Sequence, residues 1–330
     1  MQVGLGFMGS KALLSAVELD LFTVLAAHPL TAAQIGDRLA LHPRGLYDFL
    51  DVLLSMKLLE RQGDGHQALY QNTPETAAFL DKNSPAYVGG FLEMAGSRLY
   101  PFWANLSQGL RTGEPQNEIK HQAGLFEVLY SDEPRLEQFL RAMQGFQMGN
   151  FLMLAEKINF TGHRTFCDVG GANGTLASVI ARRHPHLSCI SFDLPIVAPV
   201  ARRHIEAMGA DARVVVQEGD FFKDPLPEAD VVTMGNILHD WDEDQKQVLI
   251  RKAYQAVPPG GMFIAIENVI DDARRSNTVG LLVSLNMLIE TRGGFDYTGA
   301  QFAGWCQAAG FQKIEFIPLT GATSAAIAYK

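Results

Sequence analysis

Apolar residues recur at helical spacing in the first quarter of the chain. The pattern predicts one helix over residues 11–25 and an amphipathic helix over residues 46–54. Between them, Thr31 and Gln34 have the spacing of a capping box, in which each side chain satisfies a free backbone N–H at a helix start. The sequence therefore predicts three helices in this region.

A hairpin is predicted directly after these helices. The run LLERQGDGHQALYQNT alternates in polarity around Asp64-Gly65, a dipeptide typical of tight hairpin turns. Three helices followed by a β-hairpin indicate a winged helix, to which we assign residues 1–85.

Residues 86–160 have a helical pattern and are rich in Phe, Met and Leu. Most such side chains form ordinary core, but as a group they also suit the lining of an apolar pocket. The most prominent are Phe91, Met94, Phe102, Trp103, Phe126, Phe139, Met143, Phe146 and Met148. We assign this segment as a helical linker that contributes to a substrate pocket.

The pattern changes in residues 161–330. Short runs rich in β-branched residues alternate with helical patterns over residues 176–183, 196–208 and 243–256. The strand-like runs are TFCDVGG, LSCISFDL, ARVVVQEGD, ADVVTMGNIL and GMFIAIENVI. Strands alternating with helices predict an α/β domain with a Rossmann-like parallel sheet covered on both faces.

Composition and charge exclude several classes of protein. The chain has 330 residues, of which 47% are hydrophobic, and this length favours two domains. Its formal net charge of -9 argues against nucleic-acid binding, because phosphates would be repelled on average. No apolar run reaches the roughly 18 to 20 residues that span a bilayer, so we expect no membrane partner.

The N-terminus and the cysteines indicate a cytoplasmic protein. The first residues lack the basic start and the long apolar core of a secretion signal. Cys167, Cys189 and Cys306 are isolated in apolar runs, which favours buried free thiols in a reducing compartment.

A glycine-rich loop follows the first predicted strand of the α/β domain. Asp168 ends that strand, and Gly170 and Gly174 let the backbone turn sharply and approach a ligand. Asp193 ends the second strand, where carboxylates accept ribose hydroxyls, and Asp220 follows the third. The acid before the glycines suits the positively charged amino-acid end of S-adenosylmethionine (SAM). The GxAxG spacing also departs from GxGxxG, which favours SAM over a nicotinamide dinucleotide.

Six motifs resemble those of the plant caffeate and animal acetylserotonin O-methyltransferase family: CDVGGANG, FDLPIV, EGDFF, ILHDW, PGGMFIAIE and SLNMLIETRGGFDYT. They occur in the family's order, and the winged-helix start resembles its dimerisation domain, so the likeness covers nearly the whole chain. The resemblance implies a bacterial small-molecule member that is a homodimer. It also implies methylation of a hydroxyl on a small, aromatic metabolite, with SAM converted to S-adenosylhomocysteine (SAH) and no metal.

Site residues follow from the loop and from this resemblance. The general base implied is His239, with Glu267 and Asp296 as the acids that flank it. The candidate cofactor residues are Asp168, Gly170, Gly174, Asp193, Leu194, Asp220, Phe221 and Trp241. The candidate acceptor residues are Phe139, Met143, Asn286, Met287 and Glu290.

Three positions depart from the family pattern. Ala172 stands where the loop usually has a third glycine, and we expect weakened or unchanged cofactor binding from it. Gly235-Asn236 replace a lysine and a bulky residue, which removes one cofactor contact. Asp296 replaces the commoner Glu and is one methylene shorter, so its contact with His239 is less certain.

The predicted position of His239 suits proton transfer. A phenol has a pKa near 10 and a histidine near 6.5, so an imidazole can accept the phenolic proton as the oxygen attacks a methyl group. His239 follows the apolar fourth strand and precedes an Asp-capped helix at Asp242, and Glu267 lies late in the fifth strand. Adjacent parallel strands would bring the two side chains together.

Three other functions remain open on the residues alone. The chain could be a winged-helix regulator with a ligand-sensing domain, although Asp48 and Asp51 on its recognition helix are unsuited to phosphates. It could be a member of the SAM fold that catalyses decarboxylation, hydroxylation or a pericyclic reaction. A nicotinamide dehydrogenase is the third alternative.

Overall fold

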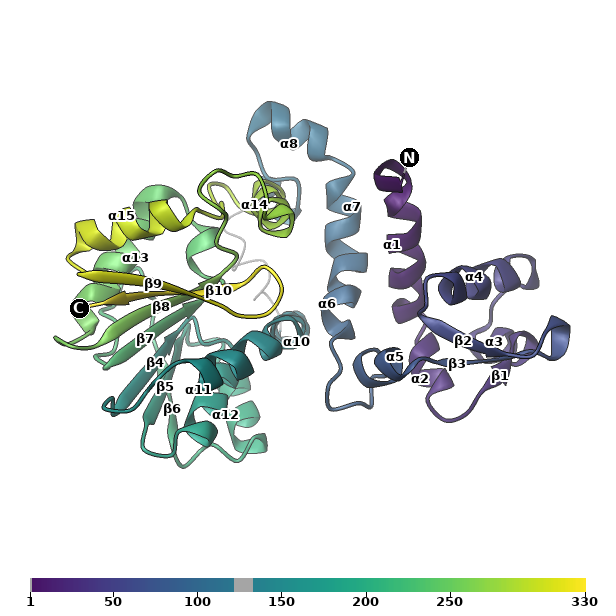
Figure 1. Cartoon of the computed structure of the whole chain (residues 1–330), viewed down its shortest axis with the longest axis horizontal. Helices are drawn as coiled ribbons and strands as arrows, with labels where there is room; N and C mark the ends of the chain where they lie inside the picture. The colour runs from purple at the N-terminus through teal and green to yellow at the C-terminus, as the bar shows by residue number, and fades with distance from the viewer. Residues whose placement is uncertain (1, 122–132) are drawn as a thin grey trace. The chain divides into compact units, whose positions relative to one another are not determined.

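The computed structural model describes residues 2–121 and 133–330, whose contacts form two compact units (Figure 1). The first unit comprises Met1–Pro101 and Arg141–Phe146, and the second comprises Phe102–Leu140 and Gln147–Lys330. Helices α7 (Tyr100–Trp103) and α10 (Glu133–Lys157) contribute residues to both. Each unit is described by itself below.

The first unit is the predicted winged helix, extended by further helices. Its elements are α1 (Gln2–Glu18), α2 (Leu21–Leu25), β1 (Leu30–Thr31), α3 (Ala32–Leu39), α4 (Pro43–Ser55), β2 (Leu59–Gln62), η1 (Gly65–Gln67), β3 (Leu69–Asn72), α5 (Pro74–Phe79), α6 (Gly89–Met94) and η2 (Ala95–Leu99). The strands pair antiparallel in the order β1-β3-β2. Thr31 and Gln34 form the predicted capping box at the start of α3.

Two local predictions in this unit need correction. The helix predicted over residues 11–25 is two helices, α1 and α2, because Asp20 adopts a left-handed conformation with φ 58° that interrupts the helical backbone. The hairpin between β2 and β3 forms, but η1 lies in its connection. Asp64 has φ −132°, so Asp64-Gly65 is no tight turn of the type that needs positive φ at both central residues.

The second unit is the predicted α/β domain. Its strands are β4 (Thr165–Val169), β5 (Ser188–Asp193), β6 (Val214–Glu218), β7 (Val231–Gly235), β8 (Met262–Glu267), β9 (Lys313–Pro318) and β10 (Ser324–Tyr329). Its helices are α8 (Leu106–Thr112), η3 (Glu118–His121), α11 (Thr175–Arg183), α12 (Ala198–Ala207), η4 (Leu238–Asp240), α13 (Glu243–Ala256), α14 (Thr278–Glu290) and α15 (Gly299–Ala309).

The order of the strands determines where a ligand can bind. Among the described residues the sheet has the order β6-β5-β4-β7-β8-β10-β9, with β10 antiparallel to both neighbours. The chain moves outward from β4 to β5 and β6, then crosses back to β7 on its other side. Such a reversal leaves a crevice outside the carboxyl ends of the parallel strands. The sheet edge next to β4 and β7 is therefore the expected ligand site.

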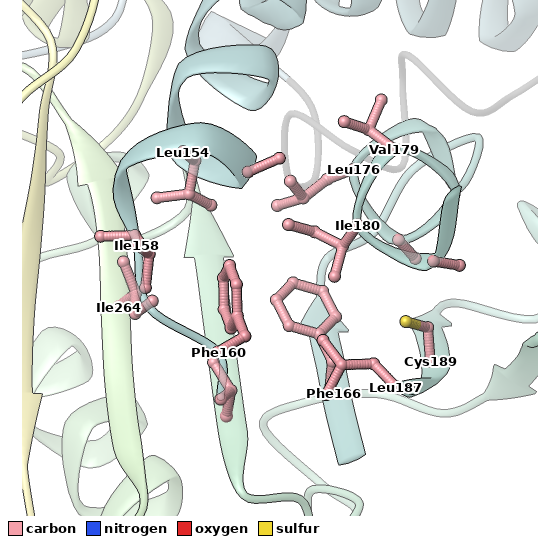
Figure 2. Packing of buried hydrophobic residues seen from close by; sticks show 14 of the residues in the cluster. Leu154, Ile158, Phe160, Phe166, Leu176, Val179, Ile180, Leu187, Cys189 and Ile264 are labelled. Carbon is pink, nitrogen blue, oxygen red and sulfur yellow. The ribbon is translucent and has the colours of Figure 1, made fainter. Parts of the chain in front are cut away.

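Helices cover both faces of the sheet (Figure 1), and alternate residues of every strand except the edge strand β6 face two separate cores, one on each side. In β4, Phe166 packs against α10, α11 and α12, whereas Cys167 faces the core formed with α13 and α15. Figure 2 shows the first of these cores, where Phe160 and Phe166 meet edge to face with ring centroids 6.2 Å apart. Burial on both faces explains the continuous apolar runs that predicted these strands.

The segment predicted as a helical linker is helical with interruptions. Helices α6 to α8 are followed by a non-helical stretch at residues 113–117, η3 and then α10. Phe126 lies outside the described residues. The last hairpin, β9–β10, was not predicted and completes the sheet beside β8.

Candidate active site

The glycine turn after β4 is held by its own backbone and by close packing. The N–H groups of Gly170 and Gly171 both donate to the carbonyl oxygen of Phe192 in β5, at 2.9 and 3.1 Å. A Cβ at Gly170 would lie 2.3 Å from Ile237, and one at Gly174 would lie 2.5 Å from Ile205. The glycines are thus required by packing inside the protein, whatever ligand the turn approaches.

Ala172 occupies a strained position in this turn. Its φ is 52°, in the left-handed region where an L-residue costs roughly 1 to 2 kcal/mol relative to the right-handed one. Its N–H donates to Asp193 Oδ2 at 2.8 Å, and its side chain packs against the buried cluster of Leu136, Leu140 and Val197. The contacts around Ala172 therefore hold a conformation that the family's glycine would adopt without strain.

Asp193 and Asp168 place two carboxylates beside the turn. Asp193 Oδ1 accepts the N–H of Leu194 at 2.7 Å, so each of its oxygens has one backbone donor and can accept another bond. Asp168 accepts from the Thr233 hydroxyl at 2.7 Å. Burial raises the pKa of Asp168 to about 7 and that of Asp193 to about 6. Both groups thus titrate near neutrality.

An aromatic cluster lies beyond these carboxylates. The Trp241 ring meets Phe222 edge to face at 4.6 Å and Phe221 at 5.9 Å, and all three side chains are half-buried. Asp220, directly before them, accepts the N–H of Phe222 and pairs with Lys223. A nucleoside combines a flat base, which packs on partly exposed rings, with ribose hydroxyls, which donate to carboxylates. The aromatic cluster and the carboxylates beside it therefore fit the adenosine part of SAM.

His239 is buried on the short helix η4, at the carboxyl end of β7. Its Nδ1 lies 3.4 Å from Asp296 Oδ1, and its Nε2 lies 3.5 Å from Asp240 Oδ1. Both distances are ion-pair contacts between an imidazole and a carboxylate. The shorter Asp296 side chain therefore reaches the imidazole, and a second acid contacts the opposite ring nitrogen.

Glu267 acts on the backbone of this turn. Its Oε1 accepts the N–H groups of Ile237 and His239, at 3.1 and 3.2 Å. The parallel pairing of β7 with β8 brings Glu267 to this position, as the sequence predicted for adjacent strands. The carboxylate that the resemblance placed beside the imidazole thus anchors the turn that carries it.

The charges around His239 shift its titration strongly. Burial alone lowers the pKa of His239, but Asp240, Asp296 and Glu267 outweigh it and raise the pKa to about 10. Burial raises the pKa of Asp240 to about 7, and it also raises the pKa of Glu267. Without a ligand, His239 is therefore an imidazolium at neutral pH.

The loop before Asp296 lies directly on the His239 turn. A Cβ at Gly294 would be 2.5 Å from the carbonyl oxygen of His239 and 2.4 Å from Thr291 Oγ1. The N–H of Gly294 donates to the same Thr291 hydroxyl at 2.8 Å. Only glycine allows this approach, so the Arg-Gly-Gly-Phe-Asp run brings Asp296 to the imidazole.

The predicted acceptor residues fall in different places. Asn286 on α14 accepts a hydrogen bond from Trp103 Nε1 at 2.7 Å, and Met287 is buried beside it. Glu290 is buried and accepts from Asn117 Nδ2 at 3.3 Å. Two further candidates lie elsewhere on α10. Phe139 packs against the same buried cluster as Ala172 of the glycine turn, and Met143 belongs to the first unit.

The sequence did not single out two polar residues near this site, Asp240 and Asn117. Asp240 directly follows His239, so an acid next to the proposed base was visible in the motif, but its reach to Nε2 depends on the η4 turn. Asn117 lies 173 positions before Glu290, and no local pattern connects them.

Within residues 2–121 and 133–330, no group of three His, Cys, Asp or Glu side chains is arranged to hold a metal ion. In the same part of the chain, no helix combines the length and the apolar character needed to span a bilayer.

Family models match most of the chain. An O-methyltransferase domain matches residues 103–312, and an O-methyltransferase dimerisation domain matches residues 1–82. These matches agree with the resemblance read from the motifs.

Individual relatives extend this similarity. The tetracenomycin polyketide synthesis 8-O-methyl transferase TcmO of Streptomyces glaucescens is 42% identical over 330 residues, which are 100% of this chain and 96% of that protein. The N,N-dimethyltransferase OxyT of Streptomyces rimosus is 37% identical over 83% of this chain and 78% of its own length. The crystal structure of human N-acetylserotonin methyltransferase in complex with SAM superposes with a TM-score of 0.92 at 31% identity, over 100% of this chain and 96% of that one.

The close approach of Gly294 gives a test of the site's geometry. We expect Gly294→Ala to lower the free energy of unfolding by about 1 to 3 kcal/mol, since the added methyl overlaps backbone that has little room to move. Gly304→Ala is the matched control: Gly304 lies inside α15 with open space around it, so alanine there should stabilise by about 0.5 to 1 kcal/mol. Equal changes in the free energy of unfolding for the two variants, measured in urea, would contradict the close approach of Gly294 to the His239 carbonyl.

Proposed function

The chain belongs to the O-methyltransferase family, and from this membership we propose that His239 accepts the proton of an aromatic hydroxyl while that oxygen takes the methyl group of SAM. The protein is a SAM-dependent O-methyltransferase that acts on a hydroxyl of a small metabolite. The aromatic acceptor and the role of each residue are our proposal.

One observation carries the assignment of the base. His239 is buried at the carboxyl end of β7, with a carboxylate 3.4 Å from Nδ1 and another 3.5 Å from Nε2. A carboxylate at Nδ1 fixes the orientation of the imidazole and stabilises the charge that it gains, as in hydrolase triads. Asp296 has this position, so Nε2 is the nitrogen that faces the acceptor.

Cofactor binding is assigned to the turn after β4 and the aromatic cluster. Asp193 accepts the ribose hydroxyls, Phe221 and Trp241 contact the adenine, and Asp168 lies at the amino-acid end. SAM supplies an electrophilic methyl group, so the protein has only to orient the acceptor oxygen and remove its proton.

The resting protonation state defines the first proton movement. His239 carries a proton at neutral pH, and Nε2 must lose it before it can act as a base. Asp240 Oδ1, 3.5 Å away, is the carboxylate in contact with Nε2, and its pKa of about 7 lies below that of His239, so it can hold this proton only transiently while the imidazole acts as a base. Neutral Nε2 then accepts the hydroxyl proton, and Asp296 stabilises the imidazolium that forms.

An amine acceptor is the second candidate. OxyT, a relative over most of this chain, is named for N,N-dimethyl transfer. The buried carboxylate Glu290 on α14 would attract a cationic amine as well as accept a bond from a hydroxyl. Including the amine 1-(aminomethyl)naphthalene beside 1-naphthol in the acceptor screen separates the two candidates.

Dimerisation and location complete the proposal. The dimerisation domain supports a homodimer, and α1 exposes apolar side chains that a second copy would cover, among them Val3, Phe7 and Met8.

Cys167, Cys189 and Cys306 are buried free thiols, as predicted, and this state fits the reducing cytoplasm. The three-part division at residues 85 and 160 remains our proposal for the functional domains.

Turnover with SAM can be measured on a panel of 1-naphthol, 5-hydroxyindole, 1,8-dihydroxyanthraquinone and 1-(aminomethyl)naphthalene. His239→Gln should lower the release of SAH from the best phenol by about 100-fold or more, because general-base catalysis is lost. His186→Gln removes an exposed histidine and should leave the rate unchanged. Unchanged turnover in His239→Gln would show that another group accepts the proton.

Binding of SAH should depend on pH. The carboxylates of Asp168 and Asp193 bind the ligand best when ionised, and their raised pKa values of about 7 and 6 mean that they gain protons as the pH falls through this range. Affinity is therefore full only above about pH 8, where Asp168 is also ionised, and by pH 5 it should be roughly tenfold weaker from Asp193 alone. In calorimetry, the SAH affinity of Asp193→Asn should depend less on pH than that of the wild-type protein. An equal pH dependence of affinity in the two proteins would contradict the assignment of Asp193 to the ligand.

The dimer is tested by sedimentation at micromolar concentration. The protein should sediment at twice the 36.2 kDa of one chain, and Phe7→Asp should shift it to the monomer, because a charge in a buried apolar interface is costly. Val215→Asp changes a residue of similar exposure on β6 and should remain dimeric. A monomeric wild-type protein would exclude the proposed dimer.

A further inference from the structure

A lysine is buried next to the proposed catalytic residues. Lys246 lies in the second turn of α13, and its exposed fraction is 0%. Lysine is almost never fully buried unless its charge is paired, because removing an ammonium from water is costly. Residues 242–247, DEDQKQ, have the polar pattern of a solvated helix start, which does not predict a buried cation.

Two contacts of Lys246 connect separate segments of the site. Its Nζ donates to the carbonyl oxygen of Trp241, two residues after His239. The same Nζ lies 3.5 Å from the centroid of the Phe295 ring, directly before Asp296. A cation over an aromatic ring is attracted to it more strongly in a dry environment than at an exposed site. One ammonium group therefore joins the segment that carries the imidazole to the segment that carries its carboxylate partner.

The surrounding charges explain why the ammonium remains charged. Burial lowers the pKa of Lys246 to about 8, opposed by Glu267 in β8, Asp296 in the following loop, Asp240 in η4 and Asp242 at the start of its own helix. Lys246 is thus mainly protonated at neutral pH. In return, its charge and that of His239 favour the ionised form of Glu267.

Each segment is irregular at this point and is anchored to a neighbouring element. His239 is on a single helical turn held by Glu267. Asp296 is in the irregular stretch between α14 and α15, where its N–H donates to Ser284 Oγ of α14 at 3.1 Å. The Gly294 backbone packs on the carbonyl of His239, which limits approach but supplies little attraction. The ammonium of Lys246 supplies attraction between them.

We propose that Lys246 is a positioning residue for methyl transfer: its buried ammonium holds the Trp241 carbonyl and the Phe295 ring together and thereby keeps Asp296 at the imidazole of His239. This role rests on the function proposed above, with His239 as the proton acceptor. The contacts of its ammonium are with the Trp241 carbonyl and the Phe295 ring, so it acts on the imidazole through these two residues.

The test compares Lys246→Met, which keeps the length of the side chain and removes its charge, with a matched control. Lys330→Met removes an ammonium that likewise donates to backbone carbonyls, of Tyr254 and Val257, and lies 4.2 Å from a ring centroid, but at the far end of α13. Hydrogen exchange of the full-length protein is followed in peptides covering residues 236–242 and 291–298, together with SAH affinity and with kcat and KM for the best acceptor in the panel.

We expect Lys246→Met to speed exchange in both segments by about tenfold or more, and to leave exchange in β4 and β5 unchanged. Its kcat should fall by about 10- to 100-fold, as misplacement of a catalytic group does, with the affinity for SAH changed less than about threefold. Phe295→Leu keeps the bond to Trp241, so it should loosen only residues 291–298. If Lys246→Met does not fold, hydrogen exchange in Phe295→Leu tests the proposed role of the Lys246 ammonium.

Either of two results would overturn the proposal. One is exchange and kcat in Lys246→Met equal to those of Lys330→Met, and the other is faster exchange spread evenly over the sheet, which indicates general support of the fold. Failure of the proposed function looks different: the wild-type protein would methylate no member of the panel, or His239→Gln would retain turnover. Hydrogen exchange needs no acceptor, so it tests Lys246 in that case as well.

Discussion

The site depends on an imidazole buried between two carboxylates. Burying His239 with Asp240 and Asp296 costs desolvation energy for every charge, and the cost is offset only if the groups lie close together in a fixed geometry. Much of the surrounding structure supplies that geometry. Glu267 anchors the backbone of the turn, and Gly294 allows the opposite loop to approach. The fold thus places its most costly groups at the sheet edge where a ligand binds.

A consequence is that the His239 imidazole carries an extra proton when no ligand is bound. The carboxylates beside His239 also raise its pKa to about 10, so the contacts that would orient the proposed base also keep it protonated. Asp240, with a pKa of about 7, is placed to exchange this proton with Nε2. In the proposed mechanism the same acids therefore orient the imidazole and offer the group that takes its proton.

The sequence predicted the architecture well and the site in part. Strand-like runs with apolar residues on both faces predicted the α/β sheet, which is confirmed, because burial on both sides leaves a clear pattern. The same reasoning placed Glu267 near His239, and the pairing of β7 with β8 brings them together. The local sequence pattern did not predict the break in helical backbone conformation at Asp20. It also did not predict contacts between distant segments, such as that between Lys246 and Phe295. Such contacts depend on loop paths that no periodicity encodes.

The protonation state of His239 in the ligand-free protein tests the central claim most directly. With ¹⁵N-labelled histidine, its imidazole signal can be assigned by its absence in a protein that lacks this side chain, and then followed by NMR from pH 5 to pH 10. The account predicts that both ring nitrogens still carry protons at pH 8, because the flanking carboxylates hold the imidazolium. Deprotonation near pH 6.5, the ordinary value for histidine, would mean that the carboxylates do not hold the ring, and would contradict the account.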